Sequence, residues 1–415
     1  MNAPARADNS VDPGLGFHAF VALMASFMAV NSLGIDAMVA ALPDIGRALG
    51  VTSDNQRQWV IAAYMLGFGV AQLIYGPLSD HFGRKPLIVT SMFCYAVMSM
   101  IAGFAPSFGV MIAARALQGV AGAASRVLVV SIVRDCYSGR RMARVMSLTF
   151  IVFLVIPAIA PGLGQAIDLI AGWRAIFVVL SLFGAMVGTI AALRLNETLH
   201  PEYRRPVSFA GIAEGIRGVL GERIALGYTI GQMTMFSALM SYINSIQQIF
   251  ADTFHQLRLF PAMFAAQAVA MASAAFVNSR LVERLGTRRI SHTALIGFIT
   301  VSAIHVLLAL RGIDTLASFA AAQCLIFFFF GMIGSNFSAM AMERVGHIAG
   351  TASSVQGFVT TIGGTTIGII VGQCYDGTTL PLALGFLGGG LCALASVLVT
   401  ERGRLFNPHH TAAKA

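Results

Sequence analysis

Two ionisable residues lie inside long apolar stretches of the sequence, where a charge is costly to bury. Asp36 stands seven residues before Pro43 near the end of the first stretch, and Arg115 stands seven residues after the start of the fourth. In helices that rise about 1.5 Å per residue, both lie roughly 10 Å from the same boundary. A carboxyl at this depth can bind and release a proton, and a nearby cation changes its proton affinity. We predict that Asp36 binds and releases a proton with Arg115 as its electrostatic partner; a permanent structural ion pair is the alternative.

A second arginine follows on the same stretch. Arg115, Gly119, Gly122 and Arg126 are spaced by four, three and four residues, which places them along one helix face. A membrane arginine avoids lipid, so this face should meet a water-filled cavity or an acidic partner. The alternatives are that Arg126 extends to the membrane interface and that the glycines serve close helix packing.

Uncharged amides within the apolar stretches add candidates for a binding cavity. Such side chains bridge helices or contact a substrate, and bridging is the more common role. Together with Arg126, the candidates for cavity residues are Asn31, Gln118, Asn244, Gln247 and Gln323. The five cysteines are scattered without metal or redox spacing, and no nucleophile elbow or phosphate-binding glycine loop occurs. We therefore expect no enzyme activity, no cofactor and no metal.

The segment "GPLSDHFGRKP", residues 76–86, concentrates special chemistry between the second and third apolar stretches. Gly76 and Pro77 are expected to end a helix, and Gly83 permits a backbone turn that other residues resist. Asp80, Arg84 and Lys85 could form salt bridges that exist in one conformation only, which would make the segment a gating loop. A solvated loop whose cations only fix the topology is the alternative.

The fifth stretch carries prolines and glycines close together. They are Pro157, Pro161, Gly162 and Gly164. A proline removes one helical hydrogen bond and bends the helix, while glycines let another helix approach. We expect a kink here, either as a functional hinge or as fixed architecture. Gly364, Gly368 and Gly372 should allow similar close packing in the eleventh stretch.

Composition identifies the class of protein. Of 415 residues, 57% are hydrophobic and 11% charged, and the mean hydropathy is +0.77; soluble domains carry about 25% charged residues. Stretches of about 20 apolar residues can cross a bilayer as helices. We predict twelve spans in an all-α membrane protein, at residues 17–43, 57–78, 84–105, 108–134, 143–168, 171–195, 223–250, 260–285, 289–311, 314–341, 347–374 and 379–400.

The positions of the cations predict the orientation. An even number of spans places both termini on one side, and most of the 27 Lys and Arg residues then lie on that side. The positive-inside rule makes this side cytoplasmic. The net charge of +9 is therefore a topology signal, and we expect no nucleic-acid partner.

The chain should divide into two halves. We expect a cytoplasmic tail at 1–16, a six-helix bundle at 17–195, a cytoplasmic linker at 196–222, a second bundle at 223–400 and a cytoplasmic tail at 401–415. A weakened copy of the charged loop, "SRLVERLGTRRI", supports a repeat. An offset of 203 residues sets Asp80 on Glu283, Gly83 on Gly286 and Lys85 on Arg288. Such repeats are common in transporters.

The loop at 76–86 resembles the signature loop of the major facilitator superfamily. The segments "GIDAMVAALPDIGRALGV", "RALQGVAGAASRVLVVSIVRD", "IPAIAPGLGQAI" and "AGTASS" resemble the 12-span drug:proton antiporters of the bicyclomycin/chloramphenicol-resistance (Bcr/CflA) type. In the antiporter motif Ala160, instead of the usual glycine, precedes Pro161.

The resemblance implies a monomeric protein of the bacterial inner membrane that exports a small amphipathic compound in exchange for protons. A permease for an endogenous metabolite or an organic anion is the alternative.

Overall fold

The computed structural model describes residues 11–406 apart from 201, 203, 205–208 and 346–348. Parts of the predicted tails and linker therefore lie outside the described residues. The described part is helical and contains no strand. Its first group of elements is α1 (Phe17–Asp36), α2 (Leu42–Ala48), η1 (Asp54–Gln58), α3 (Trp59–Phe82), α4 (Arg84–Gly103), α5 (Phe108–Cys136), α6 (Gly139–Ala171) and α7 (Trp173–Arg194). After α8 (Phe209–Gly221) follow α9 (Arg223–Gln248), η3 (Ile249–Thr253), η4 (Leu257–Leu259), α10 (Phe260–Leu285), α11 (Thr287–Leu310), α12 (Leu316–Met342), α13 (Ala349–Gln373) and α14 (Leu380–Thr400).

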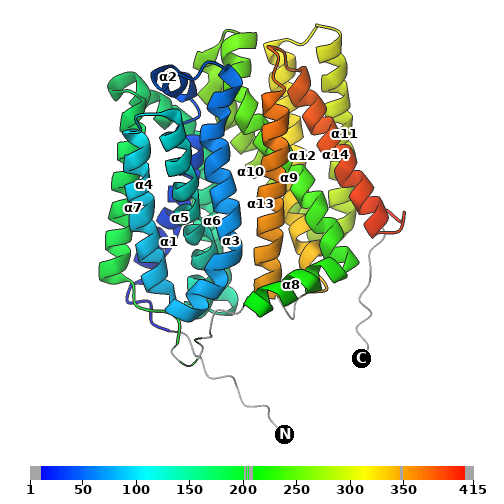
Figure 1. Ribbon diagram of the computed structural model, residues 1–415. Helices are drawn as coiled ribbons and strands as arrows, with labels where there is room; N and C mark the ends of the chain where they lie inside the picture. The colour runs from blue at the N-terminus through cyan, green and yellow to red at the C-terminus, as the bar shows by residue number, and fades with distance from the viewer. Residues whose placement is uncertain (1–10, 201, 203, 205–208, 346–348, 407–415) are drawn as a thin grey trace.

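The long helices run roughly parallel to one another and pack in two groups (Figure 1). In the first group α3 packs on α5 and α4 on α7, and in the second α9 packs on α13 and α14. The two groups meet where α3 packs on α13 and α6 on α10. We call the end near both chain termini and α8 the terminal end, and the end near α2 the distal end (Figure 1).

Ten of the described helices are long and apolar enough to cross a membrane. The two other predicted spans are α6, whose clearly apolar part is Val155–Ala171, and α9. Many of the buried side chains of α9 are Ser, Thr, Asn or Gln, which lower its hydropathy. The polar helix α9 therefore needs neighbouring helices around it, and α12, α13 and α14 pack against it.

Two proline positions correct the expected helix ends. The first span was expected to reach residue 43, but α1 ends at Asp36 and Pro43 lies in the first turn of α2. Proline at the start of a helix loses no hydrogen bond, whereas in the middle it does. Gly76 and Pro77 were expected to end a helix, yet α3 continues through both to Phe82. The break comes at Gly83, whose φ of 99° is unfavourable for other residues.

Glycines bring the helix axes together at the centre of each group. A Cβ at Gly119 of α5 would lie 1.9 Å from the carbonyl oxygen of Tyr64 in α3. A Cβ at Gly368 of α13 would lie 2.4 Å from the Cβ of Met240 in α9. Both helix pairs therefore depend on a missing side chain for their close contact, as expected for Gly364, Gly368 and Gly372.

Candidate functional site

Arg115 lies at the centre of the first helix group, and its side chain is 0% exposed. Its Nε donates to the Val60 carbonyl oxygen at 3.0 Å and its Nη2 to the Gly34 carbonyl oxygen at 2.9 Å. Its Nη1 donates to Oε1 of Gln118 at 2.6 Å, and the guanidinium lies 4.4 Å from the Tyr64 ring centroid. One cation therefore joins α1, α3 and α5.

The polar network continues away from the guanidinium. Gln118 donates to the hydroxyl of Ser99 at 2.5 Å, and Ser99 donates to the Tyr95 carbonyl at 2.7 Å. On the other side the Tyr64 hydroxyl donates to Oδ1 of Asn31 at 2.8 Å. The structure thus places Asn31 and Gln118, two predicted cavity residues, in the hydrogen-bonded surroundings of Arg115. A network of this kind fixes side-chain positions.

Asp36 occupies the last position of α1 and is 5% exposed. In the described part of the chain its carboxyl makes no hydrogen bond and no ion pair within 4.0 Å, so the permanent pair with Arg115 does not form. Arg115 instead holds the carbonyl of Gly34, two residues before Asp36. The donors of Arg115 are used by Val60, Gly34 and Gln118, so the Asp36 carboxyl is not held by this cation.

The glycine-containing face of α5 packs instead of lining a cavity. A Cβ at Gly122 would lie 2.5 Å from the Tyr64 hydroxyl, and Gly119 touches the same residue of α3. The prediction that the whole face meets water or an acid was therefore wrong for Arg115, because backbone carbonyls satisfy its donors. Arg126, further along α5, is exposed.

The predicted kink segment belongs to one helix, α6, which includes Pro157 and Pro161. A Cβ at Gly164 would lie 1.6 Å from the carbonyl oxygen of Ala37, the residue after Asp36. A Cβ at Gly162 would lie 3.6 Å from Pro261 of α10 in the second group. This stretch of α6 therefore touches both the end of α1 and the opposite helix group.

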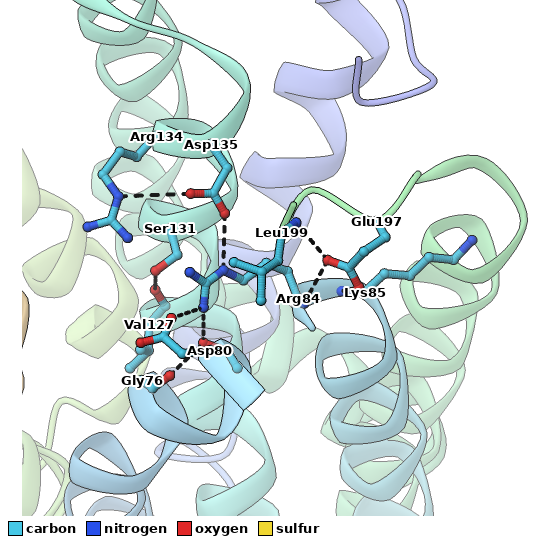
Figure 2. Close-up of polar contacts among 11 residues, drawn as sticks. Gly76, Asp80, Arg84, Lys85, Val127, Ser131, Arg134, Asp135, Glu197 and Leu199 are labelled. Atoms are coloured by element: carbon cyan, nitrogen blue, oxygen red, sulfur yellow. Dashed lines mark hydrogen bonds and ion pairs between the residues drawn. The ribbon is translucent and has the colours of Figure 1, made fainter. Parts of the chain in front are cut away.

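The predicted gating segment forms a compact charge cluster (Figure 2). Arg84 is 3% exposed and donates to Asp80 at 2.6 Å and to Asp135 of α5 at 3.0 Å. Glu197, which follows α7, accepts from the backbone N–H groups of Arg84 at 2.9 Å and Lys85 at 3.2 Å. These acceptors satisfy free donors at the start of α4. In this conformation the cluster connects elements of the first group only.

Asp135 and Glu197 were not predicted as members of this cluster. Asp135 closes the segment "RALQGVAGAASRVLVVSIVRD", and its position at the end of a span next to an arginine was an available signal. Glu197 stands about 110 residues from Arg84 and offers no local pattern. Only the packing of α7 on α4 brings it there.

Comparisons with known proteins decide the family. The sequence model described as Major Facilitator Superfamily matches residues 20–368. The chain belongs to the major facilitator superfamily. Members are transporters, so the prediction that the chain is not an enzyme is confirmed.

Named relatives and one solved structure agree with this family. The chain is 29% identical over 383 residues to the "Bicyclomycin resistance protein homolog" of Haemophilus influenzae, covering 91% of this chain and 94% of that protein. It is 26% identical over 359 residues to the "Chloramphenicol resistance protein" of Pseudomonas aeruginosa, covering 85% and 82%. The fold is similar to the crystal structure of the human organic anion transporter MFSD10 (TETRAN), with a TM-score of 0.67, 17% identity, and 92% and 99% coverage.

The second half of this superfamily fold carries its own charge cluster. Gly286 has a φ of 79°, as a counterpart of Gly83, and Arg288 donates to Glu343 at 2.9 Å and to Glu401 at 2.8 Å. Arg288 therefore pairs with two carboxylates as Arg84 does in the first half, although the matched glycines set Arg288 opposite Lys85. Glu283, the sequence match of Asp80, is exposed and makes no ion pair with Arg288.

Amide side chains join the two helix groups at the distal end. Gln58 donates to Gln248 at 2.5 Å and to the Gly372 carbonyl at 3.0 Å, and Gln248 donates to Asn55 at 2.8 Å. Gln373 donates to the Asn55 carbonyl at 2.7 Å. We call Asn55, Gln58, Gln248 and Gln373 the distal clasp. These bonds connect η1 with α9 and α13, and so hold the two groups together at this end.

The remaining predicted cavity residues lie buried in the second group. Among the described residues, Oδ1 of Asn244 and both polar side-chain atoms of Gln247 and Gln323 have no hydrogen-bond partner. By contrast Asn336 bridges to Asn278 at 2.7 Å. No group of three His, Cys, Asp or Glu side chains in the described part of the chain could hold a metal ion.

Proposed function

We propose that the chain is a proton-coupled exporter that moves small amphipathic compounds out of the bacterial cytoplasm by alternating access. The names of its bicyclomycin- and chloramphenicol-resistance relatives support a drug-like cargo. In this proposal twelve helices form two six-helix bundles at 17–195 and 223–400, and both termini lie in the cytoplasm. The protein acts as a monomer in the inner membrane, with no cofactor and no nucleic acid.

The unpaired carboxyl of Asp36 is the observation that carries proton coupling. Burying an isolated carboxylate is costly, and binding a proton removes that cost. The donors of Arg115 are already used by Val60, Gly34 and Gln118. The cation therefore does not lock the Asp36 carboxyl in an ion pair. Competition between proton and substrate at this point gives antiport.

The distal clasp supports the alternating-access part of the proposal. It joins the two helix groups at the distal end, whereas the charge clusters of Arg84 and Arg288 at the terminal end each stay within one group. With the terminal end in the cytoplasm, the clasp closes the outer side. Export then requires the clasp to open, while α3 and α13 already meet nearer the terminal end, where a Cβ at Gly76 would lie 3.7 Å from Oγ of Ser354.

Transport in everted membrane vesicles with an imposed pH gradient tests the proposal. We expect gradient-driven uptake of chloramphenicol by the wild-type protein and its loss, by at least about tenfold, in Asp36→Asn. Asp44→Asn is the matched control, because Asp44 lies near the surface in an ion pair with Arg47. Full gradient-driven uptake by Asp36→Asn overturns the role of Asp36, and absence of pH-driven uptake of any phenicol, dye or organic acid overturns antiport.

A permease for an organic anion is the second candidate, favoured by Arg126. This exposed cation lies within α5, ten residues before the end of the helix at Cys136. A cation reachable from an aqueous space attracts anions. In the same vesicles, two results together support this function. The wild-type protein takes up an organic acid but not chloramphenicol, and Arg126→Gln lowers the uptake of the acid.

A further inference from the structure

Two glutamines in the second helix group are buried without hydrogen-bond partners. Gln247 of α9 is 1% exposed and Gln323 of α12 is 0% exposed. In both side chains neither the amide nitrogen nor the amide oxygen has a partner among the described residues. Buried amides are normally satisfied, and each one left alone lowers stability. Two such side chains in one region require an explanation.

Ring contacts fix the register of these residues. Helices α9 and α12 run in opposite directions, with Tyr242 against Phe327 at 4.9 Å and Phe250 against Phe319 at 6.2 Å between ring centroids. Gln323 lies four residues from both phenylalanines, so it shares their helix face and points toward α9 midway between the two contacts. The facing position on α9 is Ile246, next to Gln247. The two glutamines therefore lie at the same depth.

Other unpartnered polar atoms surround this level. The hydroxyl of Tyr242 and Nε2 of Gln267 in α10 face each other without a well-formed hydrogen bond and have no other partner in the described residues. Tyr242 contacts Phe264 at 5.4 Å, and Gln267 follows Phe264 by about one helical turn. The nearest acid on α12's side, Asp314, is already bonded to His305, Ser318 and Thr379. The polar atoms that lack hydrogen-bond partners at this level are therefore uncharged donors and acceptors, and they lie among aromatic rings.

Bridging between helices does not account for Gln247 and Gln323. The same helix group satisfies other amides in this way, with Asn336 bonded to Asn278 at 2.7 Å and Gln356 to Gln232 at 2.6 Å. An apolar residue would fill either glutamine position without leaving polar atoms unmet. The fold leaves both side chains able to bond a partner that it does not itself supply.

We propose that Gln247 and Gln323 form a subsite that hydrogen-bonds an uncharged carbonyl, amide or hydroxyl group of the transported compound. This rests on the proposed export function. An amide side chain both donates and accepts, so it matches an amide or a hydroxyl on the ligand. Gln247 directly precedes Gln248 of the distal clasp, so opening the clasp exposes the subsite. Surrounding rings bind the apolar part of the same compound.

Calorimetric binding to the purified full-length protein in detergent tests the subsite. The probes are chloramphenicol, which is neutral and carries an amide and hydroxyls, and tetraphenylphosphonium, which has no hydrogen-bonding group. We expect Gln247→Met and Gln323→Met each to weaken chloramphenicol binding by about five- to tenfold and to leave tetraphenylphosphonium binding unchanged. Asn336→Met, which breaks a bridge between helices, should leave both affinities unchanged and lower the thermal midpoint.

The opposite results overturn the proposal. If both glutamine variants keep the wild-type affinity for chloramphenicol, the two amides do not bind the compound, whatever happens to the thermal midpoint. If wild-type protein binds tetraphenylphosphonium but not chloramphenicol, the subsite has the wrong chemistry. Should a methionine variant not fold, Gln323→Asn, which shortens the amide by one carbon, takes its place. Binding does not need proton coupling, so loss of pH-driven transport with these affinities intact contradicts only the exporter function.

Discussion

The buried polar residues around Arg115 and those around Gln323 differ in how far they are hydrogen-bonded. In the first group Arg115, Gln118, Ser99, Tyr64 and Asn31 satisfy one another or backbone carbonyls. In the second group the side chains of Gln247, Gln323 and Tyr242 have polar atoms without partners in the described residues. A satisfied network rigidifies its surroundings, whereas buried polar groups without partners lower stability. Removing polar atoms should therefore have opposite effects in these two places.

The substitution with the largest expected effect on stability removes Arg115, the cation at the centre of the first group. Arg115→Leu leaves the carbonyls of Val60 and Gly34 and the amide of Gln118 without donors, so we expect a loss of at least about 3 kcal/mol in stability. Arg115→Lys keeps the positive charge but not the planar guanidinium, so it should lose less stability than Arg115→Leu. Thermal unfolding of the purified protein measures both.

The control for Arg115→Leu in the second group is Gln323→Met. This change removes polar atoms that have no hydrogen-bond partner, so its effect on stability should be neutral or stabilising. Equal losses of stability from Arg115→Leu and Gln323→Met contradict the contrast between the two groups.

A smaller test compares two buried tyrosines. The Tyr64 hydroxyl donates to Asn31 at 2.8 Å, while the Tyr242 hydroxyl has no partner among the described residues. We expect Tyr64→Phe to destabilise by about 1 kcal/mol and Tyr242→Phe to leave stability unchanged or raise it. Denaturation midpoints of the two variants in parallel show whether the sign differs. If both variants change stability in the same direction, the two tyrosines do not differ as predicted.

The smallest expected effect is on the stability of the protein at low pH. Burial opposes ionisation of Asp314, but hydrogen bonds from His305, Thr379 and Ser318 outweigh it and hold the pKa of this carboxyl below its ordinary value. A carboxyl with a lowered pKa in the folded state adds stability above its unfolded pKa of about 4, and loses it as the pH falls through the lower folded value.

The thermal midpoint followed from pH 7 to pH 3 should therefore fall less steeply in Asp314→Asn than in the wild type. The first group should be unaffected, because none of the partners of Asp314 belongs to it. A steeper fall in the variant reverses the assigned sign.

The sequence predicts the apolar helices well and their ends less well. Pro43 and Pro77 look alike as helix breakers, yet one starts α2 and the other lies inside α3. A membrane helix can tolerate a proline when neighbours satisfy the freed backbone groups, and neighbours are absent from a linear pattern. Gly83, with its positive φ, was the more reliable break.

The site was predictable where residue type alone decides. A buried arginine must find acceptors, so its importance was evident, but those acceptors are the carbonyls of Val60 and Gly34, which every residue possesses. The alternative of a permanent ion pair with Asp36 does not occur for that reason. Gln323 and Asn336 are both buried amides on α12, and only their neighbours on other helices make one a bridge and leave the other unmet.

The distal clasp has an electrical consequence. Its bonds join neutral amides, so breaking them moves dipoles but carries no net charge through the field across the membrane. One ion pair, between Arg57 of η1 and Asp252 of η3 at 3.6 Å, crosses the same junction. Ionic strength should therefore act on the opening of this end through that pair and not through the amides of the clasp.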